Sequence, residues 1–156
     1  MRVVVSECLR GTACRYDGGA KPNSAVGELC SKVDVVGVCP ETASRLPVPR
    51  PPAEQRDGRV MLRDGTDVTE DFERGARISF AKAKSSRAPL AVLKAKSPSC
   101  GVGVIYDGTY SGSLTEGDGV FARLLEEEGI CVVTEDTVES CKPSVEHPVA
   151  IVLGSG

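Results

Sequence analysis

The sequence predicts an α/β protein, a single-domain Rossmann-like sandwich with a mostly parallel sheet, and three observations carry that prediction. Short runs of β-branched and aliphatic residues at 2–5, 33–38 and 90–93 are typical of buried strands. Segments with apolar residues at helical spacing, 69–84 and 120–128, follow later in the chain. The length of 156 residues suits one domain with an ordinary hydrophobic core.

Local signals predict the first elements in order. The strand at 2–5 leads into a loop at 6–19 that is polar and glycine-rich, and too long for a plain turn, which suggests a functional role. Asn23 or Ser24 is expected to cap a short helix that runs to Cys30. The next strand ends near residue 38.

The segment 45–56 interleaves four prolines with arginines, which excludes a helix. It is expected to form either an extended surface connector or a rigid arm that presents arginines to an anion. Residues 59–68 predict a small hairpin that turns at Asp64-Gly65. Thr69 is expected to be the N-cap of the helix that follows, with acidic residues in its first turn.

The C-terminal part continues the alternation. A short strand at 104–106 and a glycine-rich loop at 112–119 are expected to precede a helix that a glycine ends. A final core strand is expected at 130–133. Residues 1–156 are thus predicted to form one domain, with an irregular tail at about 136–156.

Composition narrows the function classes. A net charge of -3 gives no overall positive field for nucleic acid, although 19 lysines and arginines leave room for a local phosphate site. Aromatic residues are only 4% and tryptophan is absent, so a base-stacking surface is poorly supplied. No apolar run approaches the ~20 residues of a membrane span. The first residues lack a signal-peptide pattern, so a cytoplasmic location is expected.

Cysteines follow three of the predicted strands directly. Cys8, Cys39 and Cys100 come after the runs at 2–5, 33–38 and 90–93, and parallel strands would bring them to one edge of the sheet. The chain has seven cysteines, an odd number that favours metal binding or catalysis over a disulfide framework when no secretion signal is seen. The other cysteines are weaker candidates. Small buried apolar side chains are expected at positions 30 and 131, while Cys14 stays ambiguous and Cys141 lies in the tail.

The spacing of these cysteines favours an iron–sulfur cluster. Thiolates suit zinc or iron–sulfur clusters, but the close cysteine pairs of structural zinc sites are absent. One thiolate per loop fits a cluster held in a preformed pocket, and three ligands would leave one iron open as a Lewis acid. Glu41 and Ser97 lie two and three residues from candidate ligands, so a base and a proton relay are expected there.

Three other interpretations of the same thiols remain open. Cys100 is a possible nucleophile, activated by Lys94 or Lys96. Cys8 and Cys14 are a possible pair for a thiol redox enzyme. The thiols also suit a structural or binding protein that holds zinc or iron–sulfur without catalysis. His147, the one histidine, lies in the tail and is a poor candidate for a general base.

Motifs in a fixed order resemble a bacterial and archaeal family long catalogued as a domain of unknown function, some of whose members are thiouracil desulfidases. The similarity covers roughly the first 135 residues. The matching motifs are Ser6-Glu7-Cys8-Leu9-Arg10-Gly11, Cys14 to Gly19, Cys39-Pro40-Glu41, Leu46 to Glu54, Gly65 to Thr69, Lys94 to Gly101, and Ile105-Tyr106-Asp107-Gly108. Arg10 departs from the family pattern, which often has a second leucine there.

The resemblance implies a 4Fe-4S cluster held by Cys8, Cys39 and Cys100, and a non-redox reaction in which the open iron binds a thiocarbonyl sulfur. It implies that water replaces this sulfur, with Glu41 activating the water and Ser97 assisting proton transfer. The implied substrates are thiolated uracils, including 4-thiouridine monophosphate. For a nucleotide, the expected phosphate contacts are Arg15, Arg50 and Lys96, whose alternative role is solvated surface charge.

Overall fold

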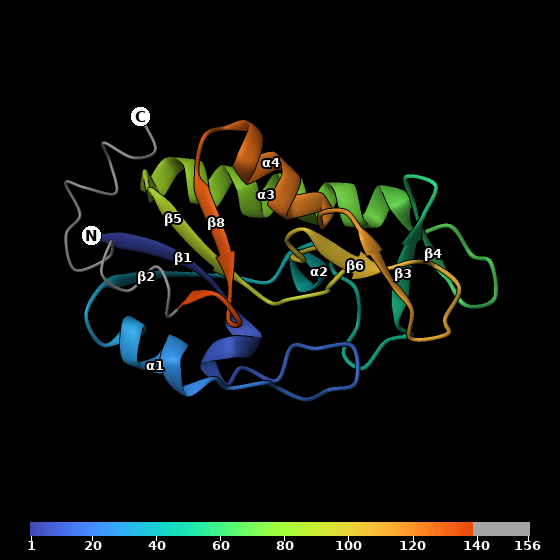
Figure 1. Ribbon diagram of the computed structural model, residues 1–156, viewed down its shortest axis with the longest axis horizontal. Coiled ribbons are helices and arrows are strands. Elements are labelled where there is room, and N and C mark those ends of the chain that lie inside the picture. Colours follow the sequence, from blue (N-terminus) through green and yellow to red (C-terminus); the bar gives the residue numbers. More distant parts are fainter. Residues whose placement is uncertain (139–156) are drawn as a thin grey trace.

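A four-stranded parallel sheet forms the centre of the computed structural model, which describes residues 1–138 (Figure 1). Its strands are β1 (Arg2–Ser6), β2 (Asp34–Val38), β5 (Leu90–Leu93) and β8 (Cys131–Thr134), in the spatial order β2-β1-β5-β8. Every neighbouring pair is parallel. The predicted fold class is therefore confirmed, and the carboxyl ends of all four strands meet at one edge.

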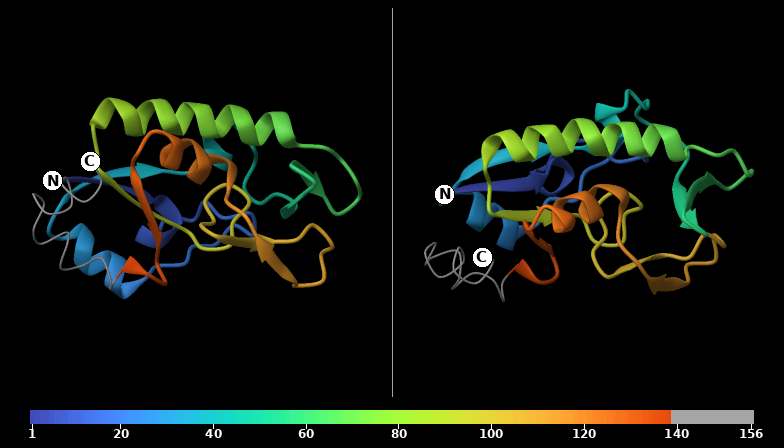
Figure 2. Two further views of the ribbon diagram at one scale, coloured as in Figure 1. Left: turned by 45° about the horizontal axis from the view of Figure 1, so that its top comes forward. Right: turned by 90° about the horizontal axis from the view of Figure 1, so that it is seen from above.

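Helices cover both faces of this sheet, giving three layers (Figure 2). On one face lie the 3-10 helix η1 (Glu7–Arg10) and α1 (Ser24–Cys30). On the other face lie α3 (Thr69–Ser86) and α4 (Val120–Glu127). The short helix α2 (Pro40–Ala43) follows β2 directly and packs against α3.

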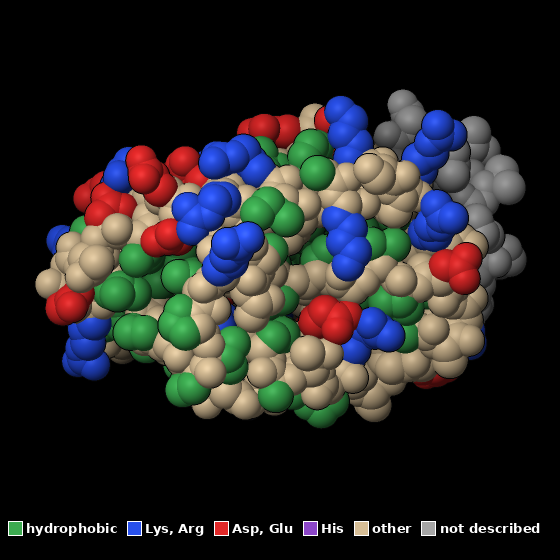
Figure 3. Space-filling model, turned by 180° about the vertical axis from the view of Figure 1, so that it is seen from behind, with side chains coloured by type: hydrophobic (Ala, Val, Ile, Leu, Met, Phe, Trp, Pro, Cys, Tyr) green, Lys and Arg blue, Asp and Glu red, His purple; other side chains and the backbone are tan. Residues whose placement is uncertain are grey.

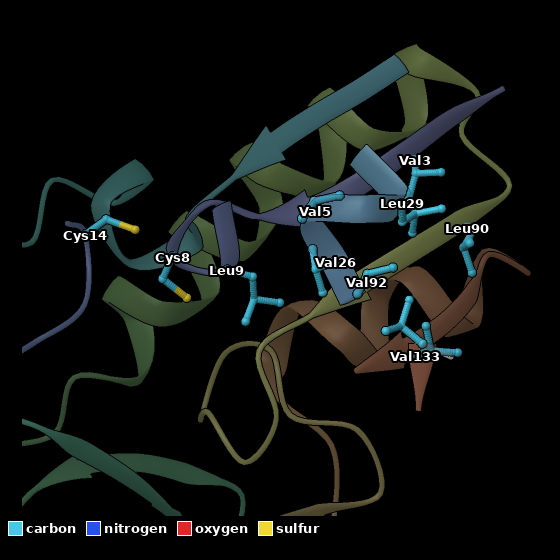
Figure 4. Close-up of a cluster of buried hydrophobic side chains, with 11 residues drawn as sticks. Val3, Val5, Cys8, Leu9, Cys14, Val26, Leu29, Leu90, Val92 and Val133 are labelled. Carbon is cyan, nitrogen blue, oxygen red and sulfur yellow. The ribbon is translucent and has the colours of Figure 1, made fainter. Parts of the chain in front are cut away.

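Side-chain alternation along β1 explains the two cores. Val3 and Val5 point to the α1 side, where they pack with Val26, whereas Val4 points to the opposite side and packs with Phe121 of α4. All five side chains are fully buried. Figure 4 shows the first of these clusters, with Cys8 lying just beyond the end of β1. The apolar runs thus build the core, and the residue types change where the strands end.

The hairpin differs from its prediction. Strand β3 (Ala53–Arg56) pairs with β4 (Arg59–Leu62), so the connecting turn is Asp57-Gly58 rather than Asp64-Gly65. Both Asp57 and Gly58 have positive φ, as a tight two-residue hairpin turn requires. Gly65 makes a second turn, in which its N–H donates to the Leu62 carbonyl. The last four residues of the proline-rich segment 45–56, Ala53–Arg56, thus belong to β3.

A second small antiparallel sheet joins β6 (Val104–Tyr106) to β7 (Leu114–Glu116). The strand at 104–106 was expected, but residues 114–116 belong to a strand and not to a continuous loop. Thr69 is the first helical residue of α3 and not its N-cap, because its hydroxyl accepts the N–H of Val60 in β4 at 2.8 Å.

Two cysteine predictions also need correction. Cys131 is exposed, because it is the first residue of β8 at the edge of the sheet, and Cys30 is only half-buried. Most of the expected tail, with Cys141 and His147, lies outside the described residues. No helix within residues 1–138 is long and apolar enough to cross a membrane.

Candidate active site

A cavity of about 520 Å³ opens at the carboxyl ends of the central strands. It is lined by the ends of β1, β2 and β5, by the proline-rich segment and by the loop before β6. The eight residues predicted to be cluster ligands, catalytic groups or phosphate contacts all line this one cavity: Cys8, Arg15, Cys39, Glu41, Arg50, Lys96, Ser97 and Cys100. The topology thus brings together side chains that are up to 92 positions apart in the chain.

Each of the three cysteines is placed by a different strand end. Cys8 lies in η1 directly after β1, and Cys39 is the residue from which α2 begins after β2. Cys100 lies in the tight loop that follows β5 and is 5% exposed. Cys8 is similarly buried, at 8%. The three cysteines therefore line one cavity, with Cys8 and Cys100 buried and Cys39 half-buried.

The loop that carries Cys100 is ordered by Ser97. Its Oγ accepts the backbone N–H groups of Ser99 and Cys100, both at 3.1 Å. The Ser97 carbonyl accepts the N–H of Gly101 at 2.8 Å. On its far side the loop caps α4, because the Ser99 carbonyl accepts the N–H of Phe121 at 2.9 Å. The loop is thus fixed from both sides.

The carboxylate of Glu41 contacts two buried groups. Its Oε1 accepts a hydrogen bond from Arg50 Nε at 2.9 Å, and its Oε2 accepts one from Ser99 Oγ at 3.3 Å. The side chain of Glu41 is 17% exposed and lines the cavity, so it remains accessible from that side.

Cations and aromatic rings form the outer part of the cavity. Lys96 is exposed, and Arg15 pairs with Asp17 at 3.1 Å while lying over the ring of Tyr16. All three tyrosines of the chain line the cavity, the other two being Tyr106 and Tyr110. Although aromatic residues are few in the chain as a whole, its tyrosines are thus concentrated at this cavity. On the face drawn in Figure 3, by contrast, basic side chains are interspersed with acidic and apolar ones.

A family model for 2-thiouracil desulfurase matches residues 3–137, which is nearly the whole chain. The chain belongs to the 2-thiouracil desulfurase family. The resemblance inferred from the sequence motifs is therefore confirmed.

Two relatives of this desulfurase-family chain are similar over most of their length. The uncharacterized protein YbbK of Bacillus subtilis (strain 168) is 38% identical over 144 residues, covering 86% of this chain and 95% of that protein. The solved structure of the 4Fe-4S-dependent thiouracil desulfidase TudS is 37% identical and has a TM-score of 0.86. That match covers 93% of this chain and 97% of TudS.

The thiols of this 2-thiouracil desulfurase family member form a donor set that fits an iron–sulfur group. Burial raises the pKa of Cys8 to about 11, and burial also raises the pKa of Cys100. A hydrogen bond with the Cys14 thiol lowers the pKa of Cys39. Buried thiols are deprotonated when soft metals bind them, and sulfur donors that reach one cavity from separate loops suit a cluster of several irons and not a single ion. Within residues 1–138, no three His, Cys, Asp or Glu side chains are grouped to hold a single metal ion.

Some residues of this desulfurase-family site escaped the sequence reasoning. Ser99 is 2% exposed and reaches Glu41, although only its neighbour Ser97 was singled out. Cys14, which the sequence left ambiguous and offered as a redox partner of Cys8, lines the same cavity, and the thiol that hydrogen-bonds with it is that of Cys39. The motif that spans residues 97–101 contained both serines, but sequence spacing alone does not say which residue each one faces.

Proposed function

We propose that this protein is an iron–sulfur-dependent desulfidase that replaces the thiocarbonyl sulfur of a thiolated uracil, as free base or nucleotide, by oxygen from water. The observation that carries the proposal is that Cys8, Cys39 and Cys100 share one cavity with Glu41 and Ser97. Membership of the family and the similarity to TudS support it. Water supplies the oxygen and the sulfur leaves as hydrogen sulfide, so no electrons are exchanged overall.

The proposed ligands of a 4Fe-4S cluster are Cys8, Cys39 and Cys100. When bound by three thiolates, such a cluster has one iron without a protein ligand, which supplies Lewis-acid chemistry toward a sulfur atom. The burial of Cys8 and Cys100 keeps bulk water away from their sulfurs. In the proposed mechanism these three cysteines only hold and shield the cluster.

The role proposed for Glu41 is to accept a proton from the attacking water. Each carboxylate oxygen has about two lone-pair positions, and each carries one hydrogen bond from the protein. Accepting capacity therefore remains on the side that faces the cavity. General-base catalysis by a side chain placed in this way typically contributes about 10²- to 10⁴-fold to the rate.

The role proposed for Ser97 is to donate a proton or hydrogen bond to the substrate. Its Oγ already accepts two backbone N–H groups at 3.1 Å, which occupy both lone pairs. The hydroxyl proton is the part of this group left to interact with the cavity that Ser97 lines. Ser97 is thus suited to act through its hydroxyl proton, and a proton that it passes to the substrate is replaced from solvent water, so the serine is unchanged after turnover.

The phosphate of a nucleotide substrate is assigned to the outer cations. These are Lys96, which is exposed, and Arg15, which is half-buried at the rim. Arg50, the third cation expected from the sequence to contact phosphate, lies deeper in the same cavity and is not one of these outer groups. A cytoplasmic location, where thiols stay reduced, is part of the proposal.

The test uses protein purified and reconstituted without oxygen. Iron, acid-labile sulfide and the visible spectrum are measured, followed by sulfide release from 4-thiouracil. We expect about four iron and four sulfide per chain, a brown colour and sulfide release. Cys8→Ala, Cys39→Ala and Cys100→Ala each remove both colour and activity, whereas Glu41→Gln keeps the colour and lowers turnover by about 10²- to 10⁴-fold.

Cys131→Ala is the matched control, because Cys131 is exposed at the amino end of β8, the end of the strand opposite to the cavity. It should leave iron content and turnover unchanged. Colourless protein with one zinc per chain would refute the proposal in favour of a zinc-binding protein. A reversible Cys8–Cys14 disulfide in active, iron-free protein would refute it in favour of a thiol redox enzyme.

A further inference from the structure

Arg50 is held inside the protein and is not free at the cavity rim. Its side chain is only 5% exposed. Nε donates to Glu41 Oε1 at 2.9 Å, Nη1 donates to the Pro47 carbonyl at 3.1 Å, and Nη2 donates to the Cys14 carbonyl at 2.8 Å. Three of the five N–H groups of the guanidinium are therefore engaged by protein acceptors.

These contacts tie three segments around Glu41. The Pro47 carbonyl belongs to the proline-rich segment, the Cys14 carbonyl to the loop after β1, and Glu41 to α2 after β2. The backbone N–H of Arg50 also donates to the Tyr16 carbonyl at 2.7 Å. The rigid arm expected from the prolines thus presents its arginine to an anion, but that anion is a carboxylate of the protein itself.

The second oxygen of Glu41 is held from the opposite direction. Ser99 Oγ donates to Oε2 at 3.3 Å, and Ser99 is only 2% exposed. Ser99 is fixed in turn, because its N–H donates to Ser97 Oγ and its carbonyl caps α4. Two contacts, one on each oxygen, remove the freedom of the carboxylate to rotate about its last bond.

We propose that Arg50 and Ser99 are positioning residues that aim the carboxylate of Glu41 at the attacking water, and that Arg50 is not a substrate ligand. This inference rests on the proposed function and assigns the phosphate to Arg15 and Lys96 instead. Misplacing a catalytic group by about 1 Å costs up to ~10²-fold in rate, so the two contacts matter for turnover more than for binding.

The first test compares two substrates that differ in the phosphate. We expect Arg50→Lys and Ser99→Ala to lower kcat about 10- to 100-fold, by the same factor for 4-thiouracil and for 4-thiouridine monophosphate. KM should change little for either substrate, and iron content should stay at the wild-type level. A higher KM for the nucleotide with unchanged turnover of the free base would identify Arg50 as a phosphate ligand and overturn the proposal.

The second test is a double-mutant cycle with Glu41→Gln. If Arg50 acts through the carboxylate, then adding Arg50→Lys to Glu41→Gln should cause no further loss of kcat. Rate losses that multiply would show that Arg50 acts independently of Glu41 and would overturn the proposal. In cluster-free protein, the fall in denaturation midpoint caused by Arg50→Lys should also shrink when residue 41 is glutamine.

Arg45→Lys is the matched control, because Arg45 is an exposed arginine five positions before Arg50 that does not line the cavity. It should leave kcat and KM unchanged. If Arg50→Lys fails to fold, Ser99→Ala tests the same proposal from the other carboxylate oxygen. Wild-type protein that releases no sulfide would overturn the proposed function and this inference together, whereas active wild-type protein with multiplying losses overturns the inference alone.

Discussion

Gly119→Ala tests whether the loop that carries Cys100 depends on close contact with α4. Gly119 precedes α4, and a Cβ at this position would lie 2.2 Å from the Ser99 carbonyl carbon and 2.4 Å from the Cys100 nitrogen. Both are backbone atoms, which cannot rotate away as a side chain can. The φ of Gly119 is -61°, which alanine adopts freely, so without this contact the substitution would stabilise the protein by about 0.4–1 kcal/mol.

Because of the clash with the backbone of Ser99 and Cys100, we expect Gly119→Ala to destabilise the protein instead. To relieve the clash, the loop must move away from α4, and this movement breaks backbone hydrogen bonds between them. The N–H groups involved donate to carbonyls of the loop: Gly119 to Gly101 at 2.8 Å, Val120 to Pro98 at 3.0 Å and Phe121 to Ser99 at 2.9 Å. Hydrogen bonds contribute about 1 kcal/mol each and overpacking costs about 1–3 kcal/mol, so we expect a net loss of about 2–4 kcal/mol. Because Cys100 moves with the loop, iron binding should fall as well.

Urea denaturation of cluster-free protein measures the stability loss, and iron per chain after reconstitution measures the loss of the site. Gly117→Ala is the control, because its Cβ would contact only the flexible end of the Ile105 side chain. That variant should lose less than about 1 kcal/mol and bind iron normally. A Gly119→Ala protein that is as stable as the wild type and takes up full iron would refute this reasoning.

Three further outcomes are expected. Gly75→Ala should lower both the denaturation midpoint and turnover, because its Cβ would clash with the Pro40 carbonyl oxygen and push α2 away from α3; unchanged turnover would argue against this packing role. Lys96→Ala should raise KM for 4-thiouridine monophosphate several-fold and leave 4-thiouracil kinetics unchanged, which steady-state assays on the two substrates would check. Burial raises the pKa of Cys8 from 9.0 to about 11, so the folded state favours the neutral thiol. The contribution of this thiol to stability is complete below pH 9, and it is lost as the pH rises toward 11 because the unfolded chain loses the proton first. Between pH 9 and pH 11, the free energy of unfolding of the cluster-free wild type should therefore fall by up to about 3 kcal/mol more than that of Cys8→Ser. Urea denaturation at each pH measures both values.

The strands and the convergence of the cysteines could be predicted because both depend on local signals. An apolar run such as Val3-Val4-Val5 identifies a buried strand, and the residue types change where the run ends. Parallel packing then brings strand ends together whatever their distance in the chain. These two signals were sufficient to predict that Cys8, Cys39 and Cys100 lie close together.

The partners of Glu41 could not be predicted, because their contacts join distant segments. Ser99 is 58 positions from Glu41, and the sequence contains no signal that distinguishes it from Ser97. Arg50 is closer in sequence, but its direction depends on the path of the proline-rich segment. The hairpin error has the same origin: two Asp-Gly turns were available, and pairing with β3, whose sequence resembles no strong strand, selected Asp57-Gly58.

Contacts made by the protein itself join the loops of the cavity, so the fold does not depend on the proposed cluster to hold these loops together. Ser6 Oγ, at the end of β1, accepts the N–H of Lys94 after β5 at 3.0 Å. Glu135, just after β8, accepts the N–H of Ala95 at 2.7 Å and pairs with Lys94 Nζ at 2.8 Å. In small zinc domains the metal supplies the folding energy, but here a buried sheet between two helical layers supplies it. Loss of the proposed cluster should therefore be a local event at the strand ends, and variants of Cys100 should fail to bind it while keeping the fold.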